Sequence, residues 1–162
     1  MRQILAFSAL SLCLAAAVGA QSSAPAHIVV AAPEVKWGPA PPVFEKGAEM
    51  AVLSGDPGKA GPFVVRLKVP AGFKVAPHWH PTDENVTVIS GTFALGMGEK
   101  FDAAALKPLG PGGYGLMPAE MRHFAMAKTA VVVQVHGTGP FALTYVNPAD
   151  DPSKRVAPVP AK

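Results

Sequence analysis

The chain has 162 residues, a length typical of a single domain. Its net charge of +3 is small and dispersed along the sequence, which argues against nucleic-acid binding. The only cysteine, Cys13, lies within the first 20 residues. If these residues are removed, the remaining protein can form no disulfide and has no thiolate nucleophile or ligand. Any bound metal must then use histidine and carboxylate side chains.

Residues 1–20 have the pattern of a secretory signal peptide. Arg2 gives a charged start, residues 4–18 are apolar, and the small residues Gly19 and Ala20 precede Gln21. A membrane anchor is the alternative, but the apolar run is shorter than the roughly 20 residues of a membrane span, and no positively charged cluster follows it. We therefore expect an exported protein, periplasmic or secreted, that begins near Gln21 and is not held in a membrane.

Three further segments follow the expected signal peptide. Residues 21–48 are rich in alanine and proline with little periodicity, which indicates an N-terminal arm or linker along the edge of the domain. Residues 49–147 contain the strand patterns and are expected to form the domain itself. Residues 148–162 are polar and rich in proline, which is typical of a tail on the surface.

Many short strands are predicted between residues 49 and 147. The clearest is 63–69, where large apolar residues recur at 63, 65, 67 and 69 with Arg66 and Lys68 between them, as in a half-buried strand. Further β-rich runs with Gly and Pro turns are 86–89, 92–97, 114–117, 122–126, 131–136 and 141–146. Residues 101–106 are the one good helix candidate. Short strands at regular spacing favour an all-β sandwich or barrel with one short helix.

Four residues form a candidate metal site. His78 and His80 are two apart, so on a strand both imidazoles point the same way, while Trp79 between them faces the opposite side and is expected to pack in the core. Glu84 has the same parity, and His123 follows on a later strand that an antiparallel fold can bring close. A lone His-x-His pair is more often a surface feature. Three imidazoles and one carboxylate suit Fe, Mn, Ni, Co, Cu or Zn, without selecting among them.

The spacing around these residues resembles two signature motifs of the cupin superfamily. The first is Gly72, five residues, His78-Trp79-His80, three residues, Glu84, six residues and Gly91. The second is Gly112, five residues, Pro118, four residues and His123. Stretches 135–137 and 145–148 are similar to those of small exported cupins, and there is a fainter likeness to the cupin domain of zinc-binding anti-sigma factors.

The resemblance implies a single jelly-roll barrel that holds one divalent metal ion through His78, His80, Glu84 and His123. The second motif departs from the family pattern twice, with Glu120 in place of glycine and Ala127 in place of asparagine. Neither departure removes a ligand. Because the glycine normally eases a turn, Glu120 predicts a turn with ordinary backbone angles.

His136 is the candidate catalytic residue. His136 and Gln134 are two apart in a strand that is otherwise rich in valine, so they face the same side of it. Either residue could point toward a metal-bound ligand. A neutral imidazole there could transfer a proton. Both residues could equally lie on an exposed face. Tyr114 and Met117 are likewise candidates either for the cavity wall or for ordinary core packing.

A site with three histidines and one glutamate leaves positions open on a six-coordinate ion. That arrangement favours an enzyme acting on a small oxygenated or anionic molecule, and in cupins such enzymes are dioxygenases, decarboxylases and isomerases. The alternative is a non-catalytic module that binds a ligand or a metal. A purely structural ion is disfavoured, because structural sites are usually closed. We also expect a homodimer in which residues 32–44 cover the partner's sheet edge.

Overall fold

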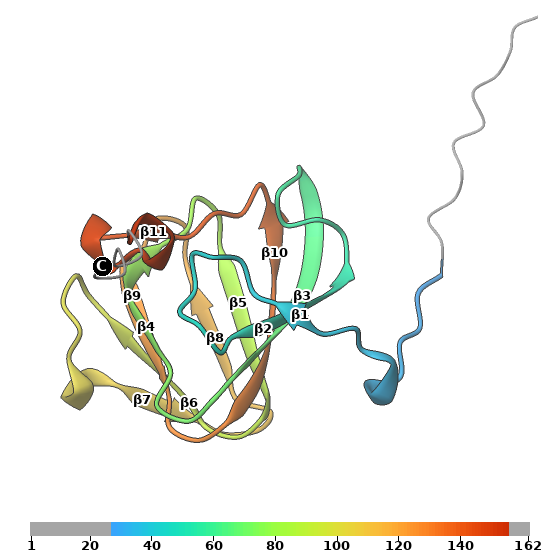
Figure 1. Cartoon of the computed structure of the whole chain (residues 1–162), viewed down its shortest axis with the longest axis horizontal. Coiled ribbons are helices and arrows are strands. Elements are labelled where there is room, and N and C mark those ends of the chain that lie inside the picture. The colour runs from blue at the N-terminus through green and yellow to red at the C-terminus, as the bar shows by residue number, and fades with distance from the viewer. Residues whose placement is uncertain (1–26, 156–162) are drawn as a thin grey trace, which may run out of the picture.

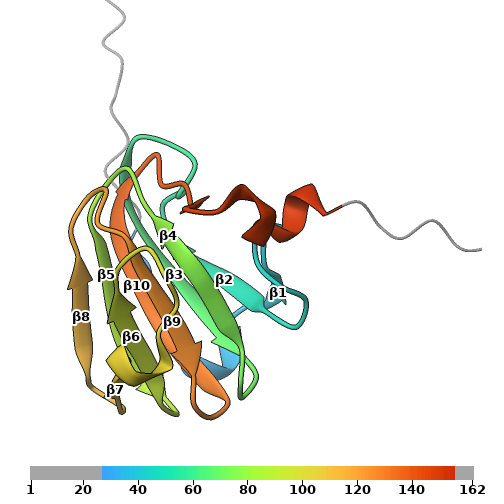
Figure 2. The same ribbon diagram turned by 90° about the vertical axis from the view of Figure 1, so that its left-hand side faces the viewer.

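Two antiparallel sheets face each other and form a barrel (Figures 1 and 2). The computed structural model describes residues 27–155, so the expected signal peptide and the end of the tail lie outside the described residues. One sheet has the strand order β1-β2-β3-β10-β5-β8 and the other β11-β4-β9-β6-β7. This is the predicted all-β jelly roll. Within the described part of the chain, no helix has the length and apolar character needed to cross a membrane.

The strands are β1 (Gly38–Pro39), β2 (Glu49–Ser54), β3 (Gly61–Val69), β4 (Lys74–Trp79), β5 (Glu84–Ser90), β6 (Phe93–Met97), β7 (Lys107–Leu109), β8 (Tyr114–Met117), β9 (His123–Ala127), β10 (Val131–Gly139) and β11 (Thr144–Tyr145). Within residues 27–155, four 3-10 turns accompany them: η1 (Ala32–Glu34), η2 (Ala103–Ala105), η3 (Pro148–Asp150) and η4 (Pro152–Lys154).

β3 and β10 form the central ladder of the larger sheet, and all nine residues of each strand are in register. The alternation predicted for residues 63–69 is confirmed: the four apolar residues are buried and the residues between them are only partly buried. β10 repeats this pattern with Val131, Val133 and Val135 buried. The inner faces of both strands therefore form one wall of the barrel interior.

Part of the predicted N-terminal arm joins the barrel. β1 pairs with β2 through Gly38 and Pro39. The hydroxyl of Tyr145 in β11 donates to the carbonyl of Val43 at 2.9 Å, which ties the following loop to the opposite sheet. As a result, residues 41–44 lie across one end of the barrel, where Val43 and Phe44 pack against the core.

Two local expectations are wrong. Residues 101–106 form only the 3-10 turn η2, in which the Asp102 carboxylate accepts a hydrogen bond from the Ala104 amide at 2.8 Å. Phe101 instead packs on the buried ring of Phe124, with the ring centres 5.0 Å apart. Trp79 does not join the core. It is partly exposed beneath the Arg122 guanidinium, 5.6 Å from the ring centre.

Glu120 also contradicts the expectation of ordinary backbone angles, because its φ is +62°. Two contacts hold the turn in this left-handed form. The Glu120 amide donates to the His80 carbonyl at 2.8 Å, and the Ala119 amide donates to the Asp83 carboxylate at 2.8 Å. The neighbouring loop therefore sets the conformation that glycine would otherwise ease. This turn leads directly into His123.

Candidate metal centre

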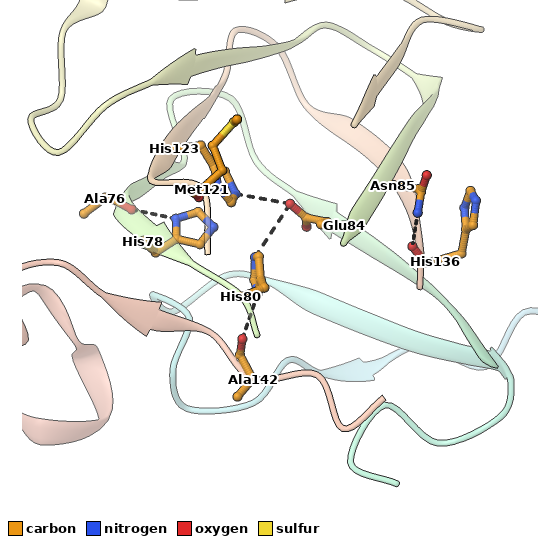
Figure 3. Close-up of polar contacts among 9 residues, drawn as sticks. All are labelled: Ala76, His78, His80, Glu84, Asn85, Met121, His123, His136 and Ala142. Carbon is orange, nitrogen blue, oxygen red and sulfur yellow. Dashed lines mark hydrogen bonds and ion pairs between the residues drawn. The ribbon is translucent and has the colours of Figure 1, made fainter. Parts of the chain in front are cut away.

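The four predicted ligands meet inside the barrel (Figure 3). His78 lies on β4, directly opposite His123 at the start of β9 in the ladder between these strands. His80 follows the end of β4, and Glu84 begins β5. One ligand atom from each residue lies within 4.8 Å of the others. Two neighbouring strands and the loop to the opposite sheet therefore bring all four side chains to one point.

Backbone carbonyls fix the orientation of all three imidazoles. The Nδ1 atoms of His78, His80 and His123 lie 2.8, 2.8 and 2.9 Å from the carbonyl oxygens of Ala76, Ala142 and Met121. A carbonyl can only accept, so each Nδ1 must carry the proton and donate. In the neutral ring the Nε2 atom then has the free lone pair, which is the form that binds a metal.

The free lone pairs create an electrostatic conflict that a cation would resolve. Nε2 of His123 lies 3.2 Å from Oε2 of Glu84, and Nε2 of His80 lies 3.6 Å from the same oxygen. Both nitrogens are buried and have no hydrogen-bond partner. Acceptors that face one another out of water repel unless a positive charge lies between them. The donor set of three nitrogens and one carboxylate therefore fits a divalent transition metal.

Burial keeps His78 and His80 in the neutral form that binds a metal. Burial, together with the nearby His123 and His80 rings, lowers the pKa of His78 to about 3. Burial also lowers the pKa of His80 despite the opposing charge of Glu84. For Glu84 burial acts to raise the pKa, but the contacts with His123 and His80 outweigh it and the pKa is lowered. Glu84 thus remains an anionic ligand at neutral pH.

The cluster borders a cavity of about 300 Å³. Inward residues of both sheets form its walls, among them Leu67, Leu95 and Val133. Most of the lining residues that are partly exposed come from loops 41–44 and 141–143 and from Pro57, so these segments form the mouth. One wall of the cavity is therefore made of ligand atoms, and a small molecule that enters through the mouth can reach them.

The structure does not bring His136 to the cluster. On β10 it is Val133 and Val135 that line the cavity, so Gln134 and His136, with the opposite parity, face the outside of the sheet. Gln134 accepts a hydrogen bond from Arg66 Nε at 3.2 Å. Figure 3 shows the His136 ring directed away from Glu84, beyond Asn85. The expectation that these two residues touch a metal-bound substrate is thus contradicted by the strand's register.

Tyr114 and Met117 do not line the cavity either. Tyr114 is exposed on β8, and its hydroxyl donates to the Asn85 side chain at 2.6 Å. Met117 is fully buried in the core. Of the two interpretations of Met117, core packing is therefore the correct one, while Tyr114 belongs to the outer surface of the sheet.

Two contributors to the site were missed by the sequence analysis. The carbonyls of Ala76, Met121 and Ala142 are backbone atoms, so the type of side chain gives no signal of their role. Phe141 stacks on the His80 ring, with the ring centres 4.2 Å apart and the planes inclined by 13°. An aromatic residue near a turn is too common a feature for its sequence to reveal that contact.

The fold and the cluster together define a cupin barrel with a candidate metal site. More narrowly, residues 25–142 match the family model described as the ChrR Cupin-like domain. The match spans most of the chain, which therefore belongs to this cupin family. No curated protein matches the sequence.

Solved structures support the same fold. The polyketide cyclase RemF from Streptomyces resistomycificus is 18% identical with a TM-score of 0.64, and the match covers 80% of this chain and 92% of that one. A putative acetylacetone dioxygenase from Methylibium petroleiphilum PM1 is 26% identical with a TM-score of 0.61, covering 80% and 88%. KdgF from Halomonas sp. is 20% identical with a TM-score of 0.52, covering 67% and 92%.

The first prediction is that His123→Ala lowers metal affinity by more than about 100-fold. It removes a direct ligand, whereas losing an outer partner of a ligand typically costs about 10–100-fold. Metal content after dialysis, measured by mass spectrometry, tests this. The matched control is His136→Ala, which removes an imidazole from the outer face of the barrel and should leave metal content unchanged. Full occupancy in the His123 variant would contradict the assignment.

Proposed function

We propose that this cupin is a metal-dependent enzyme of the dioxygenase type that acts on a small oxygenated molecule. The observation that carries the proposal is the placement of the cluster. His78, His80, Glu84 and His123 lie at the wall of a cavity rather than within solid packing. A bound ion would therefore be accessible to a ligand that enters the barrel, as a catalytic site requires.

The ion would supply a Lewis-acid centre and, if it is iron, a means of activating dioxygen. The chain's own residues would hold the ion and offset part of its charge. Three neutral imidazoles and one carboxylate leave a divalent ion with a net charge of about +1, which attracts an anionic oxygen ligand. The apolar walls beside the cluster lower the local dielectric constant, and that strengthens the electrostatic contact.

The cavity favours metal-based chemistry over proton transfer by a side chain. Among the described residues that line it, the four cluster residues are the only titratable ones. Isomerases and decarboxylases that need a separate acid or base would find none within reach. A reaction in which the ion and dioxygen do the chemistry makes no such demand on the cavity wall.

The likeness to the putative acetylacetone dioxygenase, at 26% identity over 80% of this chain, supports the same class. That protein's name describes a small molecule rich in carbonyl oxygens. The likeness does not by itself assign that substrate here, because this fold hosts many activities.

A non-catalytic binding module is the second candidate, and the same apolar wall favours it. A cavity without an acid or base can retain a ligand on an ion without converting it. Both candidates share the metal and the cavity, so turnover is the property that separates them.

The second prediction is oxygen consumption. Iron-loaded protein with a panel of small diketones, hydroxy acids and catechols should consume dioxygen with at least one of them, as followed with an oxygen electrode. The zinc-loaded protein is the control, since zinc has no redox chemistry. Tight binding without conversion under any metal would leave the binding module as the function.

We also propose export, because residues 1–20 combine a charged start, an apolar run and small residues. The third prediction is that the mature protein begins at or near Gln21, as N-terminal sequencing of protein from the periplasm or medium would determine. Soluble cytosolic protein that retains Met1 would contradict it.

We further propose a homodimer. Ile28, Val29 and Val30 are 57%, 77% and 42% exposed, an apolar segment that a second copy can cover. The fourth prediction is that Val29→Asp yields monomers in light scattering, whereas Lys128→Asp at an exposed turn does not. A monomer for the unaltered mature chain would rule the proposal out.

A further inference from the structure

Apart from its metal cluster, the cavity is entirely apolar. Of the 22 residues that line it, four belong to the cluster, and the other 18 are Val, Leu, Phe, Met, Ala or Pro. Lys, Arg, Ser, Thr, Asn, Gln and Asp are all missing from the lining within residues 27–155. The polar part of the cavity is thus confined to a single wall.

The backbone of these walls offers little to a ligand. β3, β5 and β10 each pair with a neighbouring strand on both sides, so their amides and carbonyls are used within the sheet. A hydroxyl or carboxylate of a ligand that reached Val86 or Val135 would lose its water and find no partner. Away from the mouth, the interior therefore penalises a polar group everywhere except at the ion.

The size of the cavity limits the occupant as well. A volume of about 300 Å³ is at the small end of the range for ligand sites. Phe44 and Phe141 at the mouth add aromatic surface, and the Phe141 ring already stacks on His80. A flat apolar body that extends from the cluster toward the mouth would contact aromatic and aliphatic groups along its length.

We infer that the site selects a small molecule with one chelating pair of oxygen atoms on an otherwise apolar body. Sugars, sugar acids and polycarboxylates are excluded, because their additional polar groups would be buried unpaired. This inference rests on the proposed function only in requiring that a metal occupies the cluster. It holds equally for the dioxygenase and for the binding module, because it concerns recognition and not turnover.

Two catechols with the same pair of adjacent hydroxyl groups test the inference. 4-Methylcatechol and 3,4-dihydroxybenzoate differ by a methyl group and a carboxylate on one ring position. Titration calorimetry with zinc-loaded full-length mature protein, without oxygen, should show at least about 10-fold tighter binding of the methyl compound, since the carboxylate would be desolvated without a partner. Equal or tighter binding of the carboxylate, or no binding of either compound by fully metal-loaded protein, would overturn the inference.

A variant of the wall provides the converse test. Val135→Lys places a cation in the cavity and should reduce or reverse the preference for 4-methylcatechol over 3,4-dihydroxybenzoate. Val132→Lys, on the same strand but facing outward, should leave that preference unchanged. If Val135→Lys does not fold, the near-isosteric Val135→Thr should still narrow the preference by offering one hydroxyl. A preference unaffected by any folded wall variant would contradict the inference. Loss of metal from the unaltered protein would instead overturn the proposed function.

Discussion

The site depends on three hydrogen bonds from histidine Nδ1 atoms to backbone carbonyls. They fix the tautomer of each ring, and so direct three Nε2 lone pairs at the small volume that the Glu84 carboxylate also faces. Without these bonds each ring could rotate or protonate at Nε2, and the cluster would be an ordinary group of buried polar residues. Because the carbonyls belong to the backbone, the geometry of the site follows directly from the geometry of the barrel.

Two of the three bonds are local. His78 and His123 each donate to the residue two positions earlier, Ala76 and Met121, so the strand or turn that carries the ring also orients it. The His80 carbonyl and the Asp83 carboxylate fix the turn before His123, because they stabilise the left-handed backbone conformation of Glu120. The loop from β4 to β5 and the turn before β9 therefore support each other, and the ligands lie where they meet.

The sequence predicts the barrel and the cluster because both depend on spacing. The alternation in residues 63–69 shows which face of that strand is buried. The same period of two places His78 and His80 on one side of their segment. The prediction for His136 fails because a valine-rich strand does not reveal which set of alternate residues faces inward. The pairing of Val135 with the buried Val65 places Val135 inside and His136 outside. The helix prediction for residues 101–106 fails because so short a helix is marginal on its own, and Phe101 packs on Phe124 instead.

The third histidine differs from the other two, since His80 donates to Ala142, 62 residues away in the chain. Phe141 also stacks on the His80 ring, and both Phe141 and Ala142 belong to the mouth of the cavity. Loop 141–143 thus forms part of the entrance and also fixes the orientation of Nε2 of His80. A change that moves the backbone of residues 141–143 would therefore alter ligand entry and metal binding at the same time.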